Sequence, residues 1–442
     1  MSLFLYKNAC SSEVIEVLHE LGISKSYDAI LGFVKDLSEF CIQDARLLAH
    51  SGYGYMFGYD NINISTSTFV EQRTLAPSKV QSGTHAIIYP LLRPRPAALC
   101  LAPIVKRAKH FQELKFEDIA PSSSQMDRIM RQFKSHLVRI LCCRHPSFKH
   151  LQKHPAFQPE SVRPLPRGYR TQQFPLRIST IEESTITGNI AVHVDTHEKQ
   201  LMLTHQQLSD MAIFSVNDQA TNARVRGAKL LRAKDVNPFT RCECLQLGIG
   251  LFHLGLNLIW VILHVHRGTQ NQEGSLAYWF TILEKTRLGS AHPDYHTLLA
   301  TLQQIFDGLI LDLWRLESGF SCLTEFSEKN SPSTEDLLQI AERIILQRIT
   351  PLPHPPPSEK PRKSWPDPTK DIIHQNTRLL IHDLLYVTEF IEAVSDGDWG
   401  RVEDILGQLG MIFRGAGSKN YATEILHFLH NLKYVWKGDG FE

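Results

Sequence analysis

Three acidic residues stand at places in the 442-residue chain where carboxylates can take part in chemistry. Asp60 closes the aromatic part of a strand predicted over 53–66, and Asp218 follows a strand predicted over 209–217. Glu424 lies on a late amphipathic helix. Carboxylates at the ends of neighbouring strands lie at one rim of a sheet, where sites are usually built. These three residues are our candidate catalytic and metal-ligating set, although a strand-end Asp is more commonly a turn or cap residue.

The chemistry that such a set would perform is phosphoryl transfer. Mg²⁺ prefers hard oxygen ligands from one or two carboxylates together with substrate phosphates, and Mn²⁺ accepts the same ligands. Two such ions about 3.5–4 Å apart stabilise the attacking and the leaving oxygen. The sequence contains no GxGxxG, Walker A, GxSxG or HExxH motif, which disfavours nucleotide-binding, serine-hydrolase and zinc-protease functions.

A basic run follows Asp218 directly. It contains four candidate phosphate-binding residues, Arg224, Arg226, Lys229 and Arg232. Their positive charge could neutralise phosphates beside the site, and the same pattern is also typical of a solvated helix face. Sequence alone leaves these two interpretations open.

Composition restricts the compartment and the partners. Lys and Arg total 47 against 46 Asp and Glu, so a net charge of +1 gives no global attraction to nucleic acid or membrane. The eight cysteines form no CxxC pair and the first residues form no signal peptide, so we expect an intracellular protein. KPRK (360–363) suggests the nucleus. The apolar run 245–263 is interrupted by glycines and polar residues, which favours a buried strand leading into a buried helix over a membrane span.

Periodicity and composition divide the chain into four predicted segments. The first is a helical hairpin with either a DNA-reading or a plain packing role. The second is α/β, with strands predicted over 53–66, 83–92 and 209–217. Helical periodicity predicts helices over 298–316, 371–394 and 398–411 in the third. HVDTH (193–197) alternates like a surface strand, with a zinc site as the alternative. The first segment is the hairpin 1–50, and the second is the first part of the α/β core, 51–244, with a Pro-rich excursion at 144–190. The third, 245–411, contains a buried strand and helix followed by a helical insertion, with a linker at 351–369. The fourth, 412–442, is a C-terminal helix that closes the core.

Several long motifs resemble one family. The stretch NDQATNARVRGAKLLRAKDVNPFTRCECLQLGIGLFHLGLNLIWVILHVHRG (217–268) is similar to the core of a large fungal family known as domain of unknown function 6589. YDNINIS (59–65), GTHAIIYPL (83–91) and FRGAGSKNYATEILHFLHNLKYVW (413–436) resemble its flanking blocks in order and spacing. The pattern covers most of residues 14–436.

The arrangement in that family is similar to that of mobile-element proteins with a ribonuclease-H-like core. The resemblance implies an α/β fold in which a mixed sheet is interrupted by a large helical insertion, here 270–411, with the N-terminal helical hairpin in front. It also implies that Asp60, Asp218 and Glu424 occupy the positions of the three metal-binding acids.

Several cut-and-paste transposase families carry a Cys- or Asp-x-x-His motif after the second acid, and GLFHLGLN has His253 there, with Asn257 one turn later. Gly250 stands where the Cys or Asp belongs, so the motif is incomplete, and a core histidine is the simpler interpretation of His253.

Two hypotheses follow from these observations. The first is a transposase-like protein that cleaves or transfers DNA strands with Mg²⁺ or Mn²⁺. The second is a catalytically inactive, degenerate or truncated relative that binds DNA or protein. Neutral net charge and the incomplete histidine motif favour the second hypothesis slightly. DNA is the expected partner of the first, no membrane partner is expected, and a homo-oligomer is compatible with both.

Overall fold

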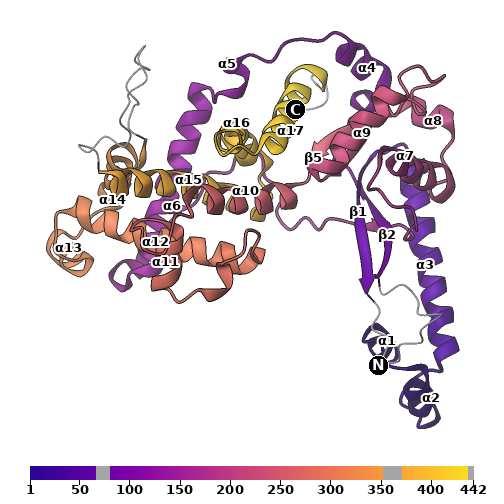
Figure 1. The fold of residues 1–442 in the computed structure, drawn as a ribbon, viewed down its shortest axis with the longest axis horizontal. Helices are drawn as coiled ribbons and strands as arrows, with labels where there is room; N and C mark the ends of the chain where they lie inside the picture. The colour runs from indigo at the N-terminus through magenta and orange to yellow at the C-terminus, as the bar shows by residue number, and fades with distance from the viewer. Residues whose placement is uncertain (66–79, 352–370, 437–442) are drawn as a thin grey trace. The chain divides into compact units, whose positions relative to one another are not determined.

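The computed structural model describes residues 1–65, 80–351 and 371–436, and it divides into two compact units (Figure 1). Unit 1 comprises Met1–Gln112, Arg170–Gly250 and Asn431–Glu442, and unit 2 comprises Glu113–Tyr169 and Leu251–His430. The chain therefore passes between the two units several times. The boundaries predicted from the sequence lie elsewhere, after residues 50, 244 and 411. KPRK and all of the predicted linker except Pro351 lie outside the described residues.

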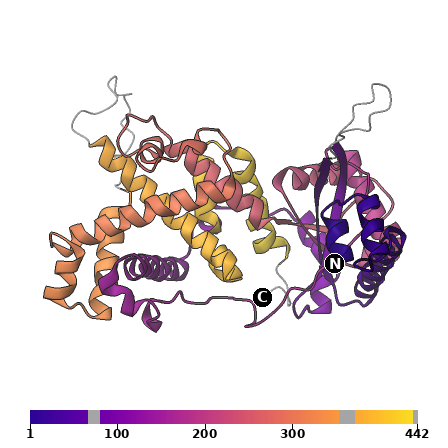
Figure 2. The same ribbon diagram turned by 90° about the horizontal axis from the view of Figure 1, so that it is seen from below.

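The predicted N-terminal hairpin is present, preceded by one short helix that the sequence did not indicate. The three helices are α1 (Ser2–Lys7), α2 (Ser12–Glu20) and α3 (Tyr27–His50), and α3 runs alongside the strands of unit 1 (Figures 1 and 2). Ser11 and Ser26 cap α2 and α3 by accepting hydrogen bonds from Val14 and Ala29 N–H groups. Helix α3 continues to His50, the end of the predicted hairpin segment, and Arg46 anchors it to the carbonyl of Gln200.

A five-stranded mixed sheet forms the centre of unit 1. Its order is β3-β2-β1-β4-β5, with β2 antiparallel to β1 and β3, and with β4 parallel to β1 and β5. The strands predicted over 53–66, 83–92 and 209–217 are confirmed as β1, β2 and β4. The bounds are β1 Tyr55–Ser65, β2 Val80–Pro90, β3 Phe174–Pro175, β4 Ile213–Asn217 and β5 Leu245–Ile249.

Alternation along β1 fixes which residues are buried. Tyr55, Phe57 and Tyr59 are buried, whereas Asp60 is exposed. Phe57 and Tyr59 pack on the rings of His193 and His197. One face of β1 therefore contributes aromatic side chains to the core of unit 1.

The strand predicted for HVDTH is wrong. Residues 193–197 belong to α7 (Ile186–Val194) and to the π-helical turn Asp195–Gln200 that continues it. His193 and His197 lie four residues apart on one helix face, and their rings stack at 5.9 Å. Both imidazoles are buried, and this burial lowers the pKa of His197 to about 3. The two histidines therefore pack in the core with Tyr55 and Tyr59.

Unit 1 also contains the α-helices α4 (Leu101–Lys109), α8 (His205–Asp210) and α9 (Gln219–Leu231).

The apolar run 245–263 forms a buried strand followed by a buried helix, as the sequence predicted. β5 is buried along its whole length, and α10 (Leu251–His266) follows it directly. No helix among the described residues is both long enough and apolar enough to cross a membrane.

Unit 2 is helical, and charged pairs join its helices. Residues 128–159 contain no Asp or Glu, and most basic residues of α6 pair with acids on neighbouring helices. Arg128, for example, contacts Asp404 at 2.6 Å, and Arg144 contacts Asp307 at 2.6 Å. The helices are α5 (Phe116–Ile119), α6 (Ser123–Arg144), α10, α11 (Leu276–Ile282), α12 (Tyr295–Ser318), α13 (Leu323–Asn330), α14 (Thr334–Arg343), α15 (Ile372–Ser395), α16 (Trp399–Gly415) and α17 (Lys419–His430).

Candidate functional site

The parallel pairing of β1 with β4 brings Asp60 and Asp218 to the same level of the sheet. Phe57 lies opposite Ser215 in the register, and each acid follows its own member of that pair by three residues. A Cβ added to Gly58 would lie 3.3 Å from the carbonyl oxygen of Val216, so the strands are still adjacent just before the acids. Adjacent strands lie about 4.8 Å apart. Sequence positions 60 and 218 are therefore brought together by the sheet.

Asp218 also has a structural role, which is the alternative that the sequence analysis left open. It is the N-cap of α9, and its Oδ1 accepts a hydrogen bond from the Thr221 backbone N–H at 2.6 Å. A capping carboxylate at this end also interacts favourably with the helix dipole. The cap fixes the orientation of the Asp218 carboxylate at the end of β4.

A third carboxylate, Glu183, joins the two aspartates. Its side chain is only 2% exposed, and burial raises its pKa from the ordinary 4.5 to about 7. The negative charges of Asp60 and Asp218 act in the same direction, whereas a hydrogen bond from Thr221 and the positive charge of Arg224 oppose the rise. Unit 1 thus contains a cluster of three acids, Asp60, Asp218 and Glu183, which we call the acid cluster.

Sequence reasoning missed Glu183. It precedes the Thr185 cap of α7 inside the segment predicted as a surface excursion, and no motif marks it. The neighbouring Glu182 is exposed, so the local sequence alone gives no reason to distinguish the two glutamates.

The basic run after Asp218 is divided among different roles. Arg224 is half-buried, and its charge acts on Glu183 and on Tyr59. Lys229 instead donates a hydrogen bond to the Leu245 carbonyl oxygen at 2.5 Å, and burial lowers its pKa. That inward contact ties α9 to β5 and accounts for Lys229 without a phosphate.

The two remaining members of the run are Arg226 and Arg232, and both are occupied by other interactions. Arg232 pairs with Asp235 at 2.6 Å near the end of α9. Arg226 is half-buried and has interactions of its own. Of the four predicted phosphate ligands, Arg224 has the best placement beside the acid cluster.

The remaining predicted site residues belong to unit 2. Glu424 is buried on α17, at 2% exposure. Asn257 on α10 donates hydrogen bonds to the carbonyl oxygen of His253 and to the hydroxyl of Tyr421, both at 2.9 Å. Tyr421 lies one turn before Glu424, so Asn257 holds the helix that carries Glu424, and the half-buried His253 ring lies against Phe252.

The acid cluster fits a hard divalent cation. One oxygen of Glu183, Oε2, is buried without a hydrogen-bond partner among the described residues, and the charges of Asp60 and Asp218 both disfavour its ionised form. Within those same parts of the chain, no three Asp, Glu, His or Cys side chains are already spaced closely enough to hold a metal ion together. One or two direct carboxylate ligands satisfy Mg²⁺, which usually keeps several of its waters.

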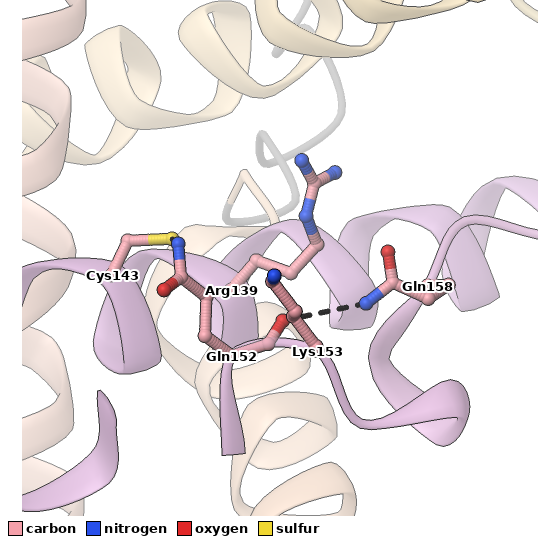
Figure 3. Close-up of a pocket in the computed structure, with 5 residues that line it drawn as sticks. All are labelled: Arg139, Cys143, Gln152, Lys153 and Gln158. Carbon is pink, nitrogen blue, oxygen red and sulfur yellow. Dashed lines mark hydrogen bonds between the residues drawn. The ribbon is translucent and has the colours of Figure 1, made fainter. Parts of the chain in front are cut away.

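A polar pocket of about 410 Å³ lies in unit 2, between the end of α6 and the segment that follows it (Figure 3). Its lining offers two cationic side chains and two amides, and no carboxylate. Gln158 donates to the Gln152 carbonyl oxygen at 3.4 Å, and Arg139 is paired with Glu392 at 2.5 Å. The lining residues are Arg139, Cys143, Gln152, Lys153 and Gln158.

Fold and site together define an α/β protein with a mixed five-stranded sheet and an acid cluster beside the end of β4, with Asp60 inside the adjacent strand β1. The family model described as "Family of unknown function (DUF6589)" matches residues 108–439, so the chain belongs to this family. The match includes Glu183, Asp218 and Glu424 and begins after Asp60. Neither a curated protein nor a solved structure matches the chain.

Proposed function

We propose that this chain is a transposase-like protein of mobile-element origin that cleaves or transfers DNA strands with Mg²⁺ or Mn²⁺. The observation that carries the proposal is the acid cluster, in which two aspartates from adjacent parallel strands act on a buried glutamate. Like charges are costly to gather unless a cation or a proton offsets them. A divalent ion is the offset that also supplies chemistry on phosphodiesters.

The strand order supports a ribonuclease-H-like core for unit 1. An antiparallel β3-β2-β1 set extended by two parallel strands, β4 and β5, is the arrangement expected of that fold. The first acid lies on β1 and the second directly follows β4, as the family resemblance implies. Fungal origin, descent from a mobile element and a nuclear location are parts of this proposal.

The candidate site residues of unit 1 have different roles in the proposed reaction. Asp60 and Asp218 would ligate the cation, and the Thr221 backbone N–H keeps Asp218 oriented. Arg224, beside the cluster, would contact a phosphate oxygen of the substrate. When bound, a pair of divalent ions activates the attacking oxygen and stabilises the leaving one. Glu424, on α17, stays a prediction as the third acid.

The direct test is strand cleavage by the full chain with Mg²⁺ or Mn²⁺, compared with Asp218→Asn. Asn keeps an N-cap acceptor, so α9 remains capped while the charge is lost. We expect cleavage by the wild-type chain and at least a hundredfold loss in the variant. No cleavage by the wild type, or equal cleavage by the variant, contradicts the proposal. Glu424→Gln tests the remaining acid in the same assay.

A second candidate is a catalytically inactive module that binds DNA through unit 2. The observation that favours it is the polar pocket, where Lys153 is exposed and forms no ion pair with any residue that the structure describes. Lys153→Glu would then weaken DNA binding uniformly across sequences and lower the slope of log affinity against log salt by about one. Binding that depends on Lys153, without cleavage, would favour this function over the first.

A further inference from the structure

Glu183 is buried in a way that costs stability unless a ligand compensates for it. Its side chain is 2% exposed, and Oε2 has no hydrogen-bond partner within the described parts of the chain. An unsatisfied buried polar group costs about 1–3 kcal/mol, and more when it is charged. Such a group in a folded protein calls for a compensating interaction.

The backbone around Glu183 is firmly positioned. The amide of Asn189 donates hydrogen bonds to the carbonyl oxygens of Glu183 at 2.6 Å and of Thr185 at 2.7 Å. Close packing adds to this, because a Cβ on Gly188 would lie 2.0 Å from the carbonyl oxygen of Glu182. The backbone that carries the Glu183 carboxylate is therefore fixed by contacts with α7.

A second strand contact stabilises the segment that leads to Glu183. Thr84 on β2 exchanges two backbone hydrogen bonds with Ser179, at 2.8 and 2.9 Å. The Thr84 hydroxyl also donates to the Ile181 carbonyl oxygen at 2.7 Å. Ser179 and Ile181 are thus bound to β2, and this brings the segment just before Glu183 to the sheet that carries Asp60.

The charges around Glu183 select a cation. Asp60 and Asp218 both act on the Glu183 carboxylate, and the opposing groups that act on it are Thr221 and Arg224. Among the charged groups that act on Glu183, the two aspartates disfavour its ionised form and Arg224 favours it. A divalent cation supplies positive charge and accepts the oxygen that lacks a partner.

We propose that Glu183 is a cation-binding carboxylate that acts with Asp60 and Asp218, either directly or through a water on the ion. The inference rests on the proposed function, because the cation is the same one, and it adds a ligand that the sequence pattern did not contain. Side chains that orient a bound metal through an intermediate contact typically change its affinity 10- to 100-fold. The experiment therefore measures affinity for the metal alone.

Mn²⁺ titration of the full chain, followed by the electron paramagnetic resonance signal of free Mn²⁺, tests this inference. Glu183→Gln keeps the shape of the side chain and removes its charge. Glu182→Gln is the matched control, because that neighbour is exposed. We expect at least tenfold weaker Mn²⁺ binding for Glu183→Gln and wild-type binding for Glu182→Gln, with both variants folded by circular dichroism.

The outcomes separate this inference from the proposed function. If Asp218→Asn weakens Mn²⁺ binding while Glu183→Gln does not, the role of Glu183 is wrong and the proposed cation site stands. If the wild-type chain does not bind Mn²⁺, both are wrong. If Glu183→Gln does not fold, Glu183→Asp replaces it, because this variant keeps the charge on a shorter side chain. We expect Glu183→Asp to bind Mn²⁺ more weakly than the wild type. Unchanged binding by Glu183→Asp overturns the inference.

Discussion

The hydroxyl of Tyr59 donates a hydrogen bond to Oδ1 of Asn189 over 2.7 Å, which connects β1 to α7. The amide of the same Asn189 holds the backbone of Glu183 at 2.6 Å. Tyr59 directly precedes Asp60 in β1, so one chain of hydrogen bonds couples the strand that carries the first acid to the loop that carries the buried one. The acid cluster is therefore built on backbone positions that support one another.

Tyr59→Phe tests this coupling. The variant leaves Oδ1 of Asn189 buried without its donor, and such a loss costs about 1–3 kcal/mol. We expect the free energy of unfolding, measured by urea denaturation, to fall by that amount. Tyr53→Phe, at a tyrosine that is 47% exposed, should change it by less than about 0.5 kcal/mol. Equal effects of the two changes would contradict the coupling.

The pKa of Glu183 predicts an unusual pH dependence of stability. The folded carboxyl has a pKa near 7 against an ordinary 4.5, so between these values the folded chain keeps a proton that the unfolded chain has lost. The free energy of unfolding should therefore decrease as pH rises from about 4.5 to about 7, by at most about 3 kcal/mol.

Comparing the wild type with Glu183→Gln isolates this contribution. Gln resembles the protonated acid at every pH, so the variant should lose the decrease and should be more stable than the wild type above pH 7. Urea denaturation at several pH values between 4.5 and 8 measures the difference. Parallel stability curves for the two chains would show that Glu183 has an ordinary pKa, and Glu182→Gln should follow the wild-type curve.

The two roles of Asp218 can be separated by a pair of variants. Asp218→Asn keeps an oxygen acceptor for the Thr221 N–H, whereas Asp218→Ala removes it. Loss of an N-cap costs about 1 kcal/mol, so Ala should be less stable than Asn by that amount in thermal or urea denaturation. Both variants should lose Mn²⁺ binding to a similar extent. A variant pair with equal stability would mean that the cap contributes nothing.

Unit 2 contains a buried ion cluster whose disruption should be severe. Arg401 contacts both oxygens of Glu389, at 2.9 and 2.8 Å, and His136 contacts the same carboxylate at 2.6 Å. Arg401→Met leaves Glu389 buried without its main counter-charge, which typically costs 3–5 kcal/mol. Arg315→Met, at an exposed pair with Asp312, should cost less than about 1 kcal/mol.

A double variant provides the matching control for that cluster. Arg401→Met combined with Glu389→Gln removes both charges, and it should regain part of the stability lost by Arg401→Met alone. Urea denaturation of the single and double variants measures the recovery. If the double variant is as unstable as the sum of the two single changes, the pair does not interact as described.

Local patterning determined much of the fold. The aromatic alternation of residues 53–66 and the apolar strands 83–92 and 209–217 were sufficient to predict β1, β2 and β4, because a period of two is the direct consequence of a half-buried strand. Helical periodicity likewise predicted α12, α15 and α16. The glycines and polar residues within 245–263 correctly predicted a buried strand and helix.

Periodicity was misleading at residues 193–197. His193 and His197 alternate with Asp195 as they would on a strand, yet they are four apart on a helix and pack on Phe57. Histidine is not counted as an apolar residue when periodicity is read from a sequence. A helix face made of buried histidines is therefore not predicted from the hydrophobic pattern.

The sequence by itself determined that Asp218 directly follows its strand, since strand patterning and turn chemistry are local. The predicted strand end at Asp60 is wrong, because β1 continues to Ser65 and pairs with β2 beyond Asp60. Tertiary structure decided that β1 and β4 are neighbours in parallel register, and that Glu183 rather than Glu182 is buried beside the two aspartates. The backbone of Glu183 is linked through Asn189 to Tyr59, 124 positions away in the chain. Hydrogen bonds over such separations form only once the sheet and α7 have packed, which is why no local pattern could indicate them.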